Sequence, residues 1–346
     1  MLSNLVTAII PAYNNANTVG KAIDSVLQQN YDNLEVVVVD DGSTDETGRV
    51  LDELAAKEPR LKIVHQANGG PAAARNRGLG EADGDYVIFV DADDSMMGDS
   101  IGAMVEMMES EHLDWVISGM RWIRVSEDGK RSVSETIDDL MRLHGPKEIK
   151  KHFFDFLHAN LILNSMCAKL YKREIIREHD IVVNDKLDMG EDFQFNLSYI
   201  RYAKMVDTYP KSIYSYEMYR STLTNRYREH LFQDRKLSTT LLKEFLEEQK
   251  LDTHIAKFLY MKLFIAQMMQ DAQHKVPVQV RKKHVADIYN GKEMKFALQD
   301  FVPQGRTEKI IYYVVRGGRY GRIWSFAKIA NFVRNHFADK FHMVSI

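Results

Sequence analysis

The sequence predicts an α/β fold, in which helices cover both faces of a mostly parallel sheet, followed by an all-helical extension. Short apolar runs alternate with stretches of helical periodicity through the first 120 residues, and beyond about residue 226 only helical periodicity remains. The composition, 45% hydrophobic and 27% charged over 346 residues, is typical of a globular chain with a substantial core.

Each element follows from this alternation. Apolar and β-branched runs predict strands at residues 5–10, 34–39, 61–65, 86–90 and 114–118. Helical spacing of apolar residues predicts helices between them, at residues 18–29, 71–79 and 99–109 and through Val50, Leu51 and Leu54. Parallel strands require such crossovers, so the pattern favours parallel pairing.

Polar loops follow the first four predicted strands, at residues 11–14, 40–45, 68–71 and 91–94. Because parallel strands end at the same edge of a sheet, these loops are expected to meet where open α/β sheets bind ligands. Carboxylates can accept hydrogen bonds from a base or a ribose, glycines let the backbone approach, and an aromatic ring can stack on a base. The loops therefore predict a nucleotide pocket.

The loop at residues 91–94 also offers Asp91, Asp93 and Asp94 to a divalent cation, since hard oxygen ligands suit Mg²⁺ or Mn²⁺. A second D-x-D sequence at residues 83–85 is interpreted as a plain turn. The apolar strand before Asp91 distinguishes the two, because it delivers this aspartate to the pocket edge.

Structural alternatives stay open for the other loops. Asp40 and Asp41 fit a turn that leads into a helix capped by Ser43 or Asp45. Residues 68–70 fit an ordinary loop, and Arg75 on the next helix is either a ligand-facing cation or a solvated surface residue.

These motifs, in this order, resemble those of the family 2 glycosyltransferases. The resemblance covers residues 6 to about 225 and is carried by IPAYN at residues 10–14, VDDGSTD at 39–45, residues 68–70 and 74–76, DADD at 91–94 and GED at 190–192. It implies a GT-A fold, which is Rossmann-like, and an inverting transfer of sugar from a nucleoside diphosphate donor, most often a UDP-sugar.

The resemblance also implies roles for individual residues. The nucleobase would be surrounded by Pro11, Tyr13, Asp41 and Arg75, with Asp40 as a substitute for Asp41. The remaining implied contacts are Asn68 and Gly70 with the nucleotide, Asp91 with the ribose, and Asp93 with a Mn²⁺ or Mg²⁺ ion that bridges the donor diphosphate.

Sugar transfer requires a base, because a sugar hydroxyl near neutral pH is a poor nucleophile. The resemblance favours Asp192 over its neighbour Glu191 for this role. Both residues also fit the first turn of a helix, where the helix dipole favours acids, and the two interpretations are compatible.

Three further residues are candidates for diphosphate contacts: Lys169, Arg220 and Ser221. A solvated lysine is the alternative for Lys169, and a capped turn is the alternative for the other two. Cys167 is expected to be a small buried hydrophobe, since no neighbouring histidine suggests an activated thiol.

The charge is unevenly distributed along the chain. Residues 306–346 contain eight Lys or Arg and two acids, which gives this segment a net charge of +6. The remaining residues carry −9, so that the whole chain has a net charge of −3. Ile323, Phe326, Ala330, Val333 and Phe337 can share a helix face with Trp324 at its margin. Such a basic amphipathic helix suits an anionic membrane interface, and packing on the helical extension or on a second subunit of an oligomer is the alternative.

The expected organisation is a catalytic domain at residues 1–225, a helical extension at 226–305 and a basic amphipathic segment at 306–346. The expected function is metal-dependent transfer of a sugar to a saccharide hydroxyl in cell-surface polysaccharide synthesis, on an acceptor that can be lipid-linked. A nucleotidyltransferase and a catalytically silent, membrane-docked nucleotide-binding scaffold are the alternatives.

A single cysteine and the absence of a signal peptide or long apolar run predict a cytoplasmic protein, with at most peripheral contact with the inner face of the membrane. Near-neutral charge and the lack of a recognised motif disfavour nucleic acid as a partner.

Overall fold

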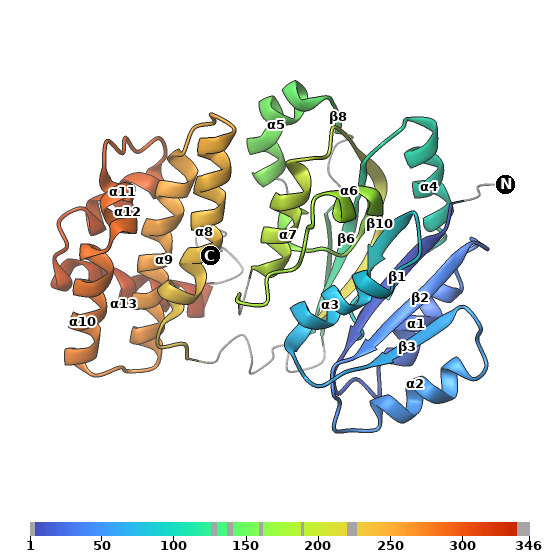
Figure 1. Ribbon diagram of the computed structural model, residues 1–346. Coiled ribbons are helices and arrows are strands. Elements are labelled where there is room, and N and C mark those ends of the chain that lie inside the picture. Colours follow the sequence, from blue (N-terminus) through green and yellow to red (C-terminus); the bar gives the residue numbers. More distant parts are fainter. Residues whose placement is uncertain are drawn as a thin grey trace. The chain divides into compact units, whose positions relative to one another are not determined.

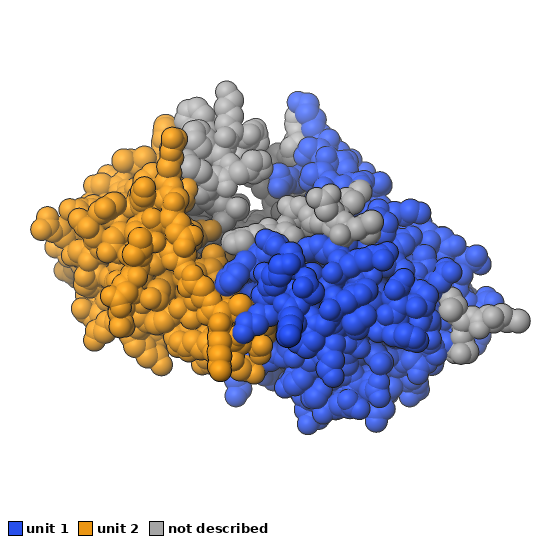
Figure 2. Space-filling model, turned by 90° about the horizontal axis from the view of Figure 1, so that it is seen from above, with its two compact units in different colours: residues 1–186, 190–221 blue, residues 187–189, 222–346 orange. Residues whose placement is uncertain are grey.

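The computed structural model describes residues 4–125, 130–136, 141–158, 162–187, 190–219 and 227–337. The chain divides into two compact units (Figures 1 and 2). Unit 1 comprises residues 1–186 and 190–221, and unit 2 comprises residues 187–189 and 222–346.

Unit 1 is built on one large sheet (Figure 1). Its strands in the described part of the chain are β1 Val6–Ala12, β2 Leu34–Asp40, β3 Leu61–His65, β4 Tyr86–Phe89, β5 Ser95–Met96, β6 Trp115–Val125, β7 Arg131–Thr136, β8 Arg142–His144, β9 Lys169–Lys172 and β10 Met205–Tyr219. The main path runs β3-β2-β1-β4-β9-β6-β10-β5, while β7 pairs with β6 and β8 with β10.

Most of this path points in one direction. Strands β3, β2, β1 and β4 pair in parallel, and so do β6 and β10. Strand β9 lies antiparallel between β4 and β6, which leaves β6 and β10 pointing the same way as β4. The expected mostly parallel sheet is therefore confirmed, with β9 as an inserted strand of reversed direction.

The four predicted crossover helices are present, as α1 Val19–Leu27, α2 Thr47–Ala55, α3 Gly70–Glu81 and α4 Ile101–Ser110. Right-handed crossovers place α1 and α2 on one face of the sheet and α3 on the other, because β1, β2 and β3 step outward and the chain then returns to β4. Between these layers, the side chains of residues 36–39 of β2 are completely buried.

Helix α3 packs very closely on the central strand. A Cβ atom added to Gly78 would lie 2.4 Å from Cγ2 of the buried Ile9, so only glycine fits at this crossing. By contrast, a Cβ added to Gly80 on the same helix would meet nothing within 4 Å. This close approach fixes α3, and with it Arg75, against the sheet.

The second half of unit 1 contains α5 Pro146–His158, a short 3₁₀ turn at Ile162–Asn164, α6 Arg173–Glu178 and α7 Glu191–Ile200. Helix α7 begins after Gly190, whose φ of 92° is readily adopted only by glycine. Strand β10 is irregular between Tyr209 and Tyr214, where its register against β6 shifts.

Unit 2 is helical, as predicted for the extension. Its helices are α8 Leu231–Glu248, α9 His254–Gln273, α10 Val278–Asn290, α11 Lys292–Leu298, α12 Arg306–Val315 and α13 Tyr320–Phe337. One core includes Phe264 and Met268 of α9, Val315 of α12 and Ile323 of α13. The observed organisation thus differs from the predicted one, because α12 and α13 share a core with the helices before them.

The apolar face that was expected to be available for a membrane lies inside unit 2. Ile323 and Ala330 are buried in its core and Phe326 packs against that core, so the alternative of packing on the helical extension is the observed one. Trp324 lies under the guanidinium of Arg281, 3.8 Å from its Cζ. No helix in the described part of the chain is long and apolar enough to span a membrane.

Candidate active site

The loops after β1 and β2 are joined by side-chain hydrogen bonds. Oδ1 of Asn14, which has a φ of 55°, accepts from the backbone N–H groups of Thr44 and Asp45, at 2.8 and 3.3 Å. The backbone N–H of Asn14 donates in turn to the Ser43 hydroxyl at 3.0 Å. The IPAYN and VDDGSTD segments therefore form one structural unit at the carboxyl edge of the sheet.

Asp41 holds the loop that follows β3. Its carboxylate accepts from the backbone amides of Gly69 and Gly70, at 2.8 and 2.7 Å, and from the side-chain amide of Gln66 at 2.7 Å. The carboxylate is buried, and Oδ2 accepts only one of these bonds. The structure thus brings together Asp41 and Gly70, two of the residues predicted to contact the nucleotide.

Asp40 has a different role from its neighbour. Its carboxylate accepts from the Ser43 amide at 3.1 Å and lies 2.9 Å from Nδ1 of His65. Although burial opposes it, these hydrogen bonds hold the pKa of Asp40 below its usual range. The structural interpretation is therefore confirmed for Asp40, which stabilises the turn after β2.

Arg75 links Asp91, in the loop after β4, to two acids of α7. Its Nη2 lies 2.9 Å from Oδ1 of Asp91, and its Nη1 lies 3.4 Å from Oε1 of Glu191 and 3.3 Å from Oδ1 of Asp192. Burial alone would lower the pKa of Arg75, but the charges of Asp192 and Asp91 raise it. Arg75 is buried, which excludes the solvated surface arginine.

Burial and neighbouring charges shift the pKa of Asp192. Burial, which is the largest effect, raises the pKa of its carboxyl to about 6, the charge of Arg75 opposes this, and the charges of Glu191 and Asp91 add to it. The backbone amide of Met166 donates to Oδ2 at 3.3 Å, and the side chain remains 18% exposed. The structural interpretation of Asp192 is confirmed, since it lies in the first turn of α7, and its role as the base stays a prediction.

The loop after β4 concentrates negative charge around a buried tyrosine. The hydroxyl of Tyr214 on β10 accepts from the Asp91 amide at 2.9 Å and donates to Oδ2 of Asp94 at 2.8 Å. Burial and the charge of Asp91 raise the pKa of Asp94 to about 8. The same two effects raise the pKa of Asp93, although part of its side chain reaches solvent.

This loop fits a divalent cation only in part. The carboxyls of this loop are crowded and have raised pKa values, so a cation would stabilise their ionised form. Asp93 offers such a cation a hard oxygen ligand. Yet the described residues contain no group of three or more His, Cys, Asp or Glu side chains able to hold a metal. A cation here would need most of its ligands from a bound diphosphate and water.

Lys169 and Cys167 are both buried. Nζ of Lys169 donates to the carbonyl of Cys167 at 3.0 Å, and burial lowers the pKa of this lysine to about 8. The solvated-lysine alternative is therefore wrong. Cys167 is the small buried residue that was expected, and burial raises the pKa of its thiol.

The remaining predicted contacts lie at the same edge or outside the described residues. Pro11 is in β1 next to Val39 of β2, Tyr13 follows β1 with 47% of its surface exposed, and Asn68 is exposed beside Gly42. Their nucleotide contacts stay predictions. Arg220 and Ser221 lie outside the described residues.

Sequence reasoning missed two features of the site. Tyr214 was not among the predicted site residues, although its hydroxyl bonds the loop that carries Asp91 and Asp94. The contact of Glu191 with Arg75 was also not foreseen. Neither carries a local signal, because the partners are more than 100 residues apart in the sequence.

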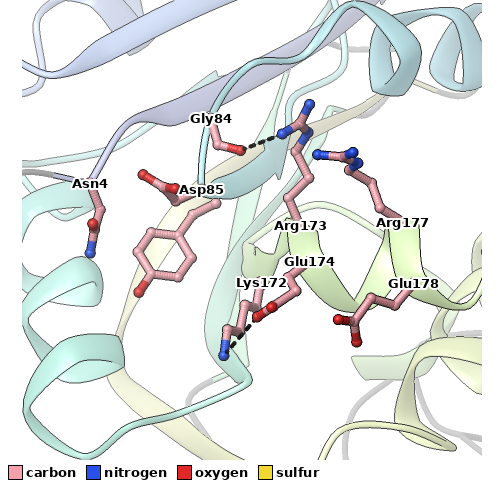
Figure 3. Close-up of a pocket in the computed structure, with 9 residues that line it drawn as sticks. Asn4, Gly84, Asp85, Lys172, Arg173, Glu174, Arg177 and Glu178 are labelled. Atoms are coloured by element: carbon pink, nitrogen blue, oxygen red, sulfur yellow. Dashed lines mark hydrogen bonds and ion pairs between the residues drawn. The ribbon is translucent and has the colours of Figure 1, made fainter.

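A separate pocket of about 680 Å³ opens at the other edge of the sheet, before the amino ends of β1 and β4 (Figure 3). It is lined by Asn4, Asp85, Arg173 and their neighbours, and it contains none of the predicted site residues. Within it, Nη1 of Arg173 donates to the Gly84 carbonyl and Lys172 pairs with Glu174.

Comparison with known proteins identifies the family and the fold of the chain. The family model of glycosyl transferase family 2 matches residues 7–180, half of the chain. The uncharacterized glycosyltransferase EpsJ of Bacillus subtilis is 31% identical over 222 residues, which cover 64% of this chain and 63% of EpsJ. Glycosyltransferase GlyA of Streptococcus pneumoniae is 28% identical over 239 residues, covering 66% of this chain and 33% of GlyA. The match thus spans less than two thirds of either relative.

Solved structures share the fold at low sequence identity. S. aureus TarS 1–349 in complex with UDP-GlcNAc has a TM-score of 0.68 at 18% identity, over 94% of this chain and 91% of that chain. The mannosyltransferase PcManGT from Pyrobaculum calidifontis, in complex with GDP-Man and Mn²⁺, has a TM-score of 0.52 at 18% identity, over 98% and 88%. The likeness to TarS confirms the expected GT-A architecture.

Proposed function

Because the chain belongs to glycosyl transferase family 2, we propose that it transfers a sugar from a nucleoside diphosphate donor to a saccharide hydroxyl, with inversion at the anomeric carbon. The nucleobase lies among Pro11, Tyr13, Asp41 and Arg75 in this proposal. The ribose lies at Asp91, and Asn68 and Gly70 also contact the nucleotide. Asp192 acts as the base.

One observation carries the proposal. Arg75 contacts Asp91 at the end of β4 and Asp192 on α7, at 2.9 and 3.3 Å, and so joins the predicted donor edge to a carboxyl with the pKa of a base. A pKa of about 6 leaves roughly nine tenths of this carboxyl ionised at pH 7, while it remains a stronger base than an ordinary aspartate.

The reaction proceeds by a single displacement. The acceptor oxygen forms a bond to the anomeric carbon as its proton passes to Asp192, and the bond from that carbon to the diphosphate breaks. The nucleoside diphosphate leaves with the electron pair, on the side opposite to the attack. Arg75 keeps Asp192 charged before the transfer, because its guanidinium favours the ionised carboxylate.

We propose Asp93 as the protein ligand of a Mn²⁺ or Mg²⁺ ion. When bound, such an ion would neutralise the negative charge that develops on the leaving diphosphate. The exposed carboxyl of Asp93 and its raised pKa support this assignment.

We propose a UDP-sugar as the donor and a lipid-linked saccharide as the acceptor, within cell-surface polysaccharide synthesis at the inner face of the cell membrane. Support for the donor comes from the fold shared with the TarS complex with UDP-GlcNAc. Lys169, Arg220 and Ser221 stay proposed diphosphate contacts, and because Lys169 is buried its contact would require a rearrangement.

The test is a donor screen with two matched variants. Purified protein is mixed with Mn²⁺ and a panel of UDP-, GDP- and other nucleotide sugars, and the melting temperature and nucleotide release are measured. We expect Asp192→Asn to keep the donor-dependent rise in melting temperature and to lose about 10²- to 10⁴-fold in turnover. Glu191→Gln, which alters the neighbouring acid on Arg75, should keep most of its turnover at pH 8.

Two results would contradict the proposal. Near-normal turnover of the Asp192→Asn variant would exclude Asp192 as the base. Stabilisation by nucleotides of another base, with none by uridine nucleotides, would show that the proposed donor is wrong.

A further inference from the structure

Helices α12 and α13 carry apolar side chains on their outer faces as well as in the core. Four large apolar side chains are exposed there: Ile310 at 48%, Tyr313 at 50%, Ile329 at 63% and Phe332 at 56%. They are four of the ten large apolar side chains exposed in the described part of the chain. This concentration on two helices indicates an interaction surface, because scattered exposure alone would need no explanation.

The two helices are joined through exposed residues near the turn between them. Nη1 of Arg322 on α13 donates to the carbonyl of Tyr313 on α12 at 2.9 Å, and the guanidinium of Arg316 lies 4.3 Å from the centre of the Tyr313 ring. Ile310 and Tyr313 lie one turn apart on α12, as do Ile329 and Phe332 on α13. Together with Lys309, Arg316, Arg322 and Lys328, these four residues form what we call the α12–α13 outer surface.

This surface is strongly basic. Its two helices and the turn between them expose six cations, at positions 306, 309, 316, 319, 322 and 328. Between residues 306 and 333 the two helices contain one acid, Glu308, which is 17% exposed and lies 2.9 Å from Nε2 of His254. The helices therefore present cations and apolar side chains, and no exposed carboxylate, over the positions whose side chains are described.

We propose that the α12–α13 outer surface docks on an anionic membrane. Cations at this surface would lie among lipid headgroups, while Ile310 and Ile329 enter the boundary of the acyl region. A second copy of the chain fits less well, because a two-fold interface sets each basic patch against its own copy. A nucleic acid would leave the aliphatic side chains without a partner.

Docking would deliver the enzyme to a lipid-linked acceptor, and this purpose rests on the proposed function. The binding itself requires neither donor nor acceptor. The two proposals therefore fail separately, since vesicle binding is measured without nucleotide and turnover is measured without vesicles.

The test uses the full chain and vesicles of phosphatidylcholine, with or without 30 to 40% phosphatidylglycerol, in a flotation assay. We expect binding only to the anionic vesicles, and weaker binding as salt is added. The triple variant Lys309→Gln, Arg316→Gln, Lys328→Gln should bind about a hundredfold more weakly, at about fivefold per cation. The double variant Ile310→Ser, Ile329→Ser should lose at least tenfold.

A matched control removes the same charge elsewhere. Lys21, Lys57 and Lys150 are exposed on unit 1, and their triple Gln variant should bind like the wild type. Unchanged melting temperatures show that each variant is folded. Equal binding by the surface variants, equal loss in the control, or no binding of the wild type to anionic vesicles would overturn the proposal. A surface variant that changes only the oligomeric state would point to an interface between copies.

Discussion

Replacing Glu191 with Gln should move the acid limb of the activity profile to lower pH. Oε1 of Glu191 and Oδ1 of Asp192 contact the same Nη1 of Arg75, at 3.4 and 3.3 Å. The two carboxylate oxygens are therefore within about 7 Å of each other, and the charge of Glu191 raises the pKa of Asp192. Removal of that charge makes Asp192 easier to ionise.

The size of the shift follows from Coulomb's law. At about 7 Å two unit charges interact by about 0.6 kcal/mol at a dielectric of 80 and about 2.4 kcal/mol at a dielectric of 20, which correspond to about 0.4 and about 1.8 pKa units. Both side chains are 18 to 19% exposed, so solvent screens the pair only in part. We expect the pKa of Asp192 to fall by about one unit.

The assay is the pH dependence of kcat/KM, which reports the ionisation of the free enzyme. The wild type should lose activity as the pH falls through about 6, because protonated Asp192 cannot accept the acceptor's proton. In the Glu191→Gln variant the same loss should occur near pH 5. An acid limb that stays in place would refute the coupling, and an unchanged limb in the Asp192→Asn variant would refute the assignment of the base.

Three further changes test the supports of the site and the core. Tyr214→Phe removes the hydroxyl that joins the backbone amide of Asp91 to the carboxyl of Asp94. The donor KM should therefore rise more than kcat falls, and Mn²⁺ should raise the melting temperature less than it does in the wild type. Gly78→Ala should destabilise unit 1 by about 1 to 3 kcal/mol in urea unfolding, whereas Gly80→Ala, which meets nothing within 4 Å, should be neutral or slightly stabilising. Asp271→Ala removes a buried carboxylate that contacts three side chains of unit 2, at 2.8, 3.0 and 3.3 Å, and should cost about 3 kcal/mol, seen as faster amide exchange in α9 and α10.

The parallel half of the sheet could be predicted because its signals are local. Each strand from β1 to β4 is a short apolar run, and each is followed by polar residues that the topology brings to one edge. Strand β9 was not predicted as an insertion, because its neighbours come from distant segments. It pairs with Tyr86 and Val87 on one side and with residues 115–117 on the other.

The candidate site shows the same limit. The sequence identifies Arg75 as a cation near the pocket, but its partners Glu191 and Asp192 lie more than 100 residues away. The apolar periodicity of α13 likewise predicts an amphipathic helix without naming what covers its apolar face. Ile323 and Ala330 meet the core of unit 2, which only the tertiary structure reveals.

The insertion of β9 has a consequence for the order in which the protein is made. Strand β4 is complete at Phe89, but β9, its neighbour on the side away from β1, begins at Lys169, about eighty residues later. At about 5 to 20 residues per second, that edge of the nascent sheet waits roughly 4 to 16 seconds for its partner. An open, apolar strand edge is a site for mispairing, so this interval is when the growing chain most needs protection by a chaperone.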